Sequence, residues 1–263
     1  PGSKELALMP FDEIAKLAAQ VGYDGLCMRA SQAGTQTPRH ERQQMRQVLD
    51  GLGLQVSMVT ADFDIPKNNS RAPLALRNIN PHLDVAEDFG AKLIRIGMKS
   101  EEDIHWAQKA CSLAGERGIS LVHQSHTLTL FETVEKSLEI LKRVNRENFG
   151  IVFEPANLHV CGQDYGPETI KKFAPWLMNV YLQNFRITPD GPMKMDTWVR
   201  GVVSVESQPF GAPGSINFSE VFEGLQAVNY DGVVTVHHNV AEDMVPSEGI
   251  KSFYDYLNSQ VDF

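Results

Sequence analysis

Short apolar runs alternate with segments of helical periodicity along the whole chain. Apolar side chains recur at helical spacing in the ranges 11–21, 38–52, 76–89, 101–117, 129–144, 167–173, 218–228 and 247–257. Between them lie runs with the length of buried strands, at 25–28, 54–59, 92–96, 119–123, 150–154, 179–183 and 232–237. Strands and helices that alternate in this way form a parallel sheet with right-handed crossovers.

The size of the chain favours a closed barrel over an open sheet. The chain has 263 residues, and about 250 residues is the usual size of a (β/α)8 barrel. An open doubly wound sheet usually has a Gly-x-Gly-x-x-Gly turn after its first strand, and the sequence has no such motif. We therefore predict one (β/α)8 TIM barrel domain over residues 1–263, in which the first strand, within 5–9, is short or missing.

The composition limits the classes of partner. The formal net charge is −9 and no long run of Lys and Arg occurs, so nucleic acid is not expected. No stretch of about 20 apolar residues occurs, so no membrane span is expected. Three scattered cysteines, Cys27, Cys111 and Cys161, indicate a reducing compartment rather than a disulfide framework. We predict a cytoplasmic protein that binds a small molecule.

Polar side chains end four of the apolar runs: Gln124, Glu154, Gln183 and His237. Residues at the carboxyl ends of barrel strands converge on one central site. A buried Glu154 carboxylate needs a cationic partner, which is either a metal or an arginine such as Arg186. Alternation along the last strand points His237 inward, where it is a metal ligand, a general base or a core histidine bonded to a backbone carbonyl.

Other candidates lie at or just beyond the strand ends. His126 follows Gln124 by two residues on the same strand face, and it is either a catalytic acid or base or a plain loop histidine. Three residues are placed to hydrogen-bond a polyol or, alternatively, to stabilise loops: Asn157, Arg29 and Asp62. The long connections 60–73 and 187–217 follow strands, and we predict that the second is a lid rather than a surface insertion.

Three motifs carry a resemblance to a known family. They are Phe11-Asp12-Glu13-Ile14 with Val21-Gly22-Tyr23-Asp24-Gly25, then Phe153-Glu154-Pro155-Ala156-Asn157, and last Gly214-Ser215-Ile216-Asn217-Phe218 with Asn229-Tyr230-Asp231-Gly232. With them the chain resembles the xylose isomerase-like sugar isomerases and epimerases over nearly its whole length. The resemblance implies a (β/α)8 barrel and a divalent metal (Mn, Mg, Co or Zn).

In that family Glu, Asp, His and Glu at four strand ends usually hold the metal. The matching positions here are Gln124, Glu154, Gln183 and His237, and each differs from the usual residue. Amide oxygens are weak ligands for hard cations, so Gln124 and Gln183 either complete a loose metal site or hydrogen-bond sugar hydroxyls.

The substitutions also change the expected mechanism. An amide is not a base, so a mechanism with two symmetrical carboxylates is not expected. Instead His126 or His237 would remove a proton next to a carbonyl and give an enediol, with a metal or Arg186 stabilising the oxyanion.

We predict an enzyme of the isomerase or epimerase type that acts on a small polyhydroxy carbonyl compound. One alternative is a dehydratase or lyase that acts on a keto-sugar or keto-inositol with the same first step. Another is a non-catalytic barrel that binds sugars or supports a partner subunit. Barrels of this class often pair, so a homo-oligomer stays open by analogy.

Overall fold

The computed structural model describes residues 9–61, 70–240 and 244–260. The first strand, predicted within 5–9, falls outside this part of the chain except for Met9, and Asp62 falls outside it as well.

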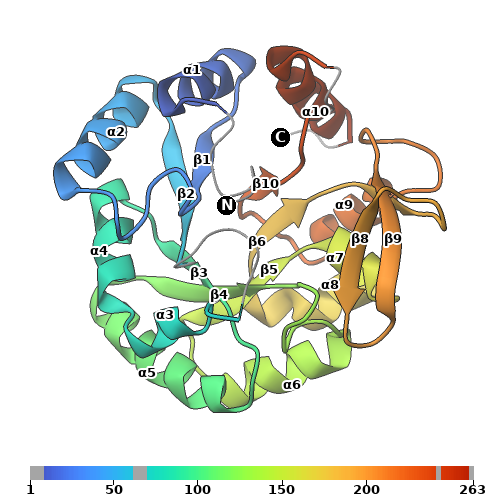
Figure 1. Cartoon of the computed structure of the whole chain (residues 1–263), viewed down its shortest axis with the longest axis horizontal. Coiled ribbons are helices and arrows are strands. Elements are labelled where there is room, and N and C mark those ends of the chain that lie inside the picture. Colours follow the sequence, from blue (N-terminus) through green and yellow to red (C-terminus); the bar gives the residue numbers. More distant parts are fainter. Residues whose placement is uncertain (1–8, 62–69, 241–243, 261–263) are drawn as a thin grey trace. The chain divides into compact units, whose positions relative to one another are not determined.

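Helices and strands alternate in the order that the sequence predicts (Figure 1). The helices are α1 Phe11–Val21, α2 Arg39–Gly51, α3 Leu74–Arg77, α4 Asn80–Phe89, α5 Glu102–Glu116, α6 Val134–Val144, α7 Pro155–Val160, α8 Pro167–Phe173, α9 Phe218–Ala227 and α10 Pro246–Gln260, with a 3-10 turn η2 at Ala174–Trp176. The strands of the main sheet are β1 Gly25–Met28, β2 Gln55–Thr60, β3 Leu93–Ile96, β4 Ser120–Gln124, β5 Phe149–Phe153, β6 Leu177–Leu182 and β10 Val234–Val236.

These strands form one sheet of seven in the order β1-β2-β3-β4-β5-β6-β10. Every pairing that is described between them is parallel. The order follows the sequence, as it does when each strand returns through a helix to the next position of a barrel. The seven strands predicted between the helices are all present.

Two predicted helices differ from the structure. The range 76–89 is not one helix, because α3 ends at Arg77 and α4 begins at Asn80 with Pro81 in its first turn. A proline ring has no N–H and clashes with the carbonyl four residues earlier, so it begins a new helix. The range 129–144 is helical only from Val134, and the Thr133 hydroxyl caps it by accepting the Lys136 N–H at 3.2 Å.

The chain divides into two compact units. The first, residues 1–123 with 144–150, contains β1 to β3 and most of β4, with α1, α2, α4 and α5 along the strands (Figure 1). Its helices are joined by a buried ion pair in which Arg42 of α2 lies 2.7 Å from Asp88 of α4. Side chains such as Leu49, Phe89 and Ile94 are completely buried between helices and strands.

The second unit comprises residues 124–143 and 151–263. Here β6 pairs with β5 on one side and with β10 on the other. Helices α8 and α9 approach closely at Gly224, where a Cβ would lie 2.9 Å from the Cα of Pro167. The glycine therefore lets these two helices pack side by side. The prediction of a single domain over 1–263 stays a prediction.

A second sheet fills most of the long segment 187–217. Strands β7 Phe185–Ile187, β8 Met193–Thr197 and β9 Gly201–Ser207 are antiparallel in the order β7-β9-β8, and the figure draws β8 and β9 in orange (Figure 1). The segment is thus a folded hairpin and not an irregular loop. Whether it acts as a lid stays a prediction.

Candidate functional site

Glu154 lies at the junction of β5 and α7. All five residues of β5 are buried, so the strand runs through the core and delivers Glu154 at its carboxyl end. Pro155 starts α7, which keeps Glu154 extended at φ −132° and ψ 101° as the residue before a proline. The Glu154 side chain is completely buried.

The two oxygens of the Glu154 carboxylate have different surroundings. Oε2 accepts hydrogen bonds from Asn157 Nδ2 at 2.7 Å and from Gln124 Nε2. Asn157 is itself held by a second bond, from the same nitrogen to the Ser125 carbonyl at 2.9 Å. Oε1 is buried and has no hydrogen-bond partner among the described residues. Oε1 lies 3.5 Å from His237 Nδ1.

His237 follows the short strand β10. Its backbone N–H donates to the Leu182 carbonyl at 2.9 Å, which extends the pairing of β10 with β6. Its Nδ1 lies 2.6 Å from Gln183 Nε2, and its ring lies 4.5 Å from the Tyr181 ring. The His237 side chain is 20% exposed, whereas Glu154 is fully covered. A ligand from solvent therefore meets the imidazole before it meets the carboxylate.

The structure thus brings the four strand-end side chains together in the second unit. They form one polar chain, Gln124–Glu154–His237–Gln183. Polar atoms of successive side chains in it lie 3.5 Å apart or less. Asn157, predicted to bind substrate or to stabilise a loop, donates to the carboxylate.

Arg186 does not pair with Glu154. Its Nη2 lies 2.7 Å from Glu206 Oε2, across the β7–β9 pair, and both side chains are largely exposed. The arginine alternative for compensating Glu154 is therefore wrong. Arg29 lies in the first unit, and Asp62 lies outside the described residues.

The two other histidines near the strand ends differ in their surroundings. His126 is half-buried, and its Nδ1 lies 2.9 Å from the Thr127 carbonyl, which accepts a hydrogen bond from that nitrogen. His238 packs among the rings of Phe185, Phe210 and Phe253, and burial lowers its pKa to about 4. His238 is therefore a neutral, half-buried histidine packed among aromatic rings.

The chemistry of the donor set decides whether a metal fits. No group of three His, Cys, Asp or Glu side chains suited to a metal occurs within the described ranges. The chain Gln124–Glu154–His237–Gln183 nevertheless supplies one uncompensated carboxylate oxygen, one imidazole and two amides. Ligand atoms around a small divalent cation lie about 3 Å apart, because each bond is about 2.1 Å long.

His237 Nδ1 and Glu154 Oε1 lie 3.5 Å apart, close to that spacing, and Gln183 is in contact with His237. The amide nitrogens face Glu154 and His237, so both amides must turn by half a rotation to offer oxygen. The residues therefore fit a loosely held divalent cation.

Comparison with known proteins assigns the family. The family described as Xylose isomerase-like TIM barrel matches residues 15–256, so this chain belongs to it. The predicted (β/α)8 barrel and the resemblance are both confirmed. In the described part of the chain, no helix combines the length and apolar character that a membrane crossing requires.

Curated relatives match part of the chain. It is 27% identical over 180 residues to the uncharacterized protein MJ1311 of Methanocaldococcus jannaschii, which covers 68% of the chain and 48% of the relative. This chain is also 27% identical over 132 residues to inosose dehydratase of Clostridium perfringens, and the match covers 49% of this chain and 43% of the relative. The chain spans about half the length of the curated relatives it matches.

Solved structures match nearly all of this chain. The probable 3-DHS dehydratase AsbF from Bacillus anthracis has a TM-score of 0.72 at 16% identity, covering 97% of this chain and 95% of that one. D-allulose 3-epimerase from Methylomonas sp. has a TM-score of 0.68 at 13% sequence identity, and the match covers 95% of this chain and 92% of that one. A Xylose isomerase-like TIM barrel protein from Mycobacterium smegmatis, in complex with magnesium, has a TM-score of 0.67 at 16% sequence identity. The match covers 98% of this chain and 91% of that one. These likenesses show the fold.

Proposed function

We propose that the protein is an enzyme that removes a proton next to the carbonyl of a small polyhydroxy compound, with His237 as the base. The observation that carries this proposal is the contact between part-exposed His237 and buried Glu154, at 3.5 Å. The relatives named inosose dehydratase, 3-DHS dehydratase and D-allulose 3-epimerase support the substrate class.

The Glu154 carboxylate makes His237 a better base, because it stabilises the positive charge that forms on the imidazole. When the imidazole takes the proton, the imidazolium forms beside the one carboxylate oxygen that has no hydrogen-bond donor. The attraction between these charges is strong in a buried setting and favours the step. Gln183 holds Nδ1 in place, and its amide oxygen accepts a hydrogen bond from the protonated Nδ1 once the amide has turned.

The electron pair of the broken C–H bond moves to the carbonyl oxygen and gives an enediolate. Alternatively, Gln124, Glu154, Gln183 and His237 would hold a divalent cation (Mn, Mg, Co or Zn), which when bound would polarise the substrate carbonyl; His237 would then be a ligand and His126 the base. His126 stays a candidate for a second acid, two residues beyond Gln124. Arg186, Asn157, Arg29 and Asp62 stay candidates for substrate contacts.

The fate of the proton separates two reactions. If His237 returns it to the neighbouring carbon, the product is an isomer. If it protonates a departing β-hydroxyl group, water leaves and the enzyme is a dehydratase. The dehydratase is the second candidate, because both a curated relative and a solved neighbour carry that name.

The test is turnover of a keto-inositol and of keto-sugars in deuterated water, followed by NMR and mass spectrometry. Isomerisation gives deuterium in a product of otherwise unchanged composition, whereas dehydration gives the loss of one water. We expect H237A to lower kcat by about 10²- to 10⁴-fold. The matched control is H40A, since His40 is an exposed histidine of α2. Exchange that is equal in H237A and H40A would contradict the proposal.

A further inference from the structure

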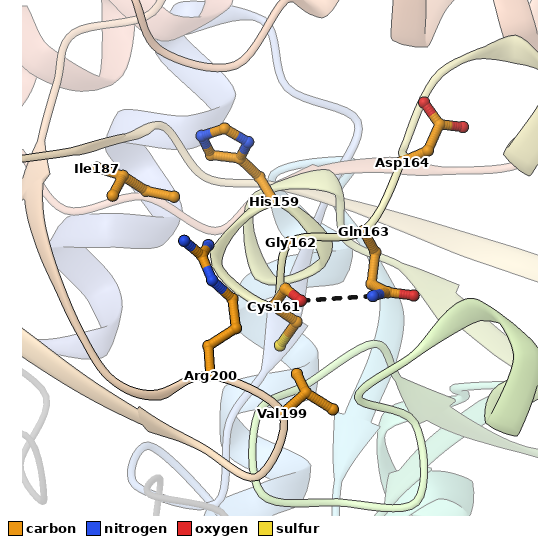
Figure 2. Close-up of a pocket in the computed structure, with 8 residues that line it drawn as sticks. All are labelled: His159, Cys161, Gly162, Gln163, Asp164, Ile187, Val199 and Arg200. Atoms are coloured by element: carbon orange, nitrogen blue, oxygen red, sulfur yellow. Dashed lines mark hydrogen bonds between the residues drawn. The ribbon is translucent and has the colours of Figure 1, made fainter.

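A second concave site lies in the same unit, at the end of α7. The pocket has a volume of about 730 Å³, within the range of sites for small molecules. It lies between the α7–α8 connection and the β8–β9 turn (Figure 2), and its lining residues are His159, Cys161, Gly162, Gln163, Asp164, Ile187, Val199 and Arg200. No residue of the Gln124–Glu154–His237–Gln183 chain lines it.

Arg200 supplies the positive charge of this pocket. Its guanidinium donates one hydrogen bond, from Nη1 to the Val160 carbonyl at 3.1 Å, and has no carboxylate partner in the described part of the chain. An arginine has five N–H donors, so most of this guanidinium can meet a ligand. Paired N–H groups of this kind bind carboxylate and phosphate in a fork geometry.

The backbone holds Arg200 in place. Its N–H donates to the Thr197 hydroxyl at 2.8 Å, and that hydroxyl donates to the Gly201 carbonyl at 3.0 Å. The neighbouring Trp198 N–H donates to the buried carboxylate of Glu132 at 2.7 Å, which fixes the turn to the segment before α6. The Arg200 stem crosses Gly162, where a Cβ would lie 3.1 Å from Cδ. The guanidinium is thus positioned before a ligand arrives.

His159 and Cys161 are uncharged neighbours of Arg200. Burial and then the charge of Arg200 lower the pKa of His159, so its imidazole is neutral near pH 7 and offers a hydrogen bond. Burial raises the pKa of Cys161 to about 12, and its thiol contacts Glu132 at 3.7 Å. The thiol is therefore not an activated nucleophile.

The far side of the pocket has a different character. Figure 2 shows Asp164 and Gln163 on the side away from the guanidinium, which points toward His159 and Ile187. Asp164 accepts hydrogen bonds from the Thr169 hydroxyl and from the Gly166 N–H at 3.4 Å. The Gln163 amide accepts from the Val134 N–H at 3.2 Å and donates to the Cys161 carbonyl at 3.4 Å. The second N–H of Gln163 and the remaining lone pairs of Asp164 suit hydroxyl groups, and the carboxylate opposes a second anionic group.

We infer that this pocket binds a small polyhydroxylated ligand that carries one carboxylate or phosphate. The anionic group meets Arg200, and the hydroxyl groups meet Gln163 and Asp164. The site is additional to the proposed proton-transfer site, because its residues are separate.

The test is calorimetric titration of the full chain with D-gluconate and sorbitol, a matched anionic and neutral pair, and with inorganic phosphate. We expect gluconate and phosphate to bind more tightly than sorbitol. R200Q should lower the affinity for gluconate about 10- to 100-fold, and R200K should lower that affinity less. The matched control is R146Q, since exposed Arg146 also donates Nη1 to a backbone carbonyl, that of Asn145 at 3.0 Å.

Equal losses in R200Q and R146Q, or sorbitol binding as well as gluconate, would overturn the inference. E154Q should keep the affinity for gluconate, which separates this site from the proposed proton transfer. Non-competitive inhibition of turnover by gluconate would support a separate site, and competitive inhibition would overturn it.

Discussion

The Glu154–His237 pair and the Arg200 pocket are built from different parts of the same unit. The pair lies at the ends of β5 and β10, and its carboxylate is completely buried. The pocket lies on a turn and on a connection between helices, and Arg200 is exposed. The first region isolates one charge from water, whereas the second presents one charge to it.

This difference determines what each region can do. A charge held in the interior changes the proton affinity of its neighbours strongly, which suits proton transfer. A charge at the surface interacts weakly with its neighbours but remains available to ligands. Variants of the two regions should therefore separate turnover from anion binding.

The largest effect is expected from E154A. This change removes the carboxylate beside His237 and leaves the amides of Gln124 and Asn157 without their acceptor. We expect kcat to fall about 10²- to 10⁴-fold and the free energy of unfolding to fall by about 1–3 kcal/mol. Steady-state kinetics and urea denaturation measure the two changes. Full turnover in E154A would remove Glu154 from the site.

Metal addition should give the next largest effect. An excess of Mn²⁺ at about 100 times its Kd adds about 2.7 kcal/mol of stability, which raises Tm by about 5–10 °C for a chain of this size. Calorimetric scans before and after chelation, with metal analysis by mass spectrometry, measure it. H237A should lose the response and R200Q should keep it. The same response in H237A would place the cation elsewhere.

A smaller effect is expected from G162A. Gly162 has φ +70° and lies under the Arg200 stem, so a methyl group strains the turn and displaces the guanidinium. We expect the affinity for gluconate to fall about 10-fold while turnover stays within about 2-fold, because no atom of the Glu154–His237 pair moves. G118A is the matched control, since Gly118 has φ +64° and open space around it. Equal loss in both variants would argue against the pocket.

The smallest effect is the titration of His159, which NMR of its ring can follow. Its pKa lies below the usual value because of burial and of Arg200, so R200Q or a bound anion should raise that pKa. The folded chain binds this proton more weakly than the unfolded chain does. The contribution of His159 to stability is therefore lost as pH falls below about 6.5, the unfolded value. An unchanged pKa in R200Q would show that Arg200 does not face the ring.

The sequence predicts the strand-end cluster because strand periodicity is a local property. Each apolar run ends at an identifiable residue, and a parallel sheet then brings Gln124, Glu154, Gln183 and His237 to one edge. Family resemblance strengthened this prediction at Phe153-Glu154-Pro155. What the sequence alone did not predict is the hydrogen bond from Asn157 to the Glu154 carboxylate.

The pocket was missed because its parts are distant in the sequence. Arg200 lies in a segment that was interpreted as an irregular connection, although Met193, Met195 and Thr197 alternate with polar residues as a strand does. Only the pairing of β8 with β9 and the bond from Arg200 to Val160 place it over α7. A helix as short as α7 gives no periodic signal either.

The amides at positions 124 and 183 have a consequence for how the protein matures. A set of several carboxylates would repel itself until a cation arrived, and folding would then depend on metal supply. The set found here carries a single formal negative charge, which one proton on His237 is enough to balance. We therefore expect the chain to reach its native structure without a metal, so that the proposed cation would bind only after folding.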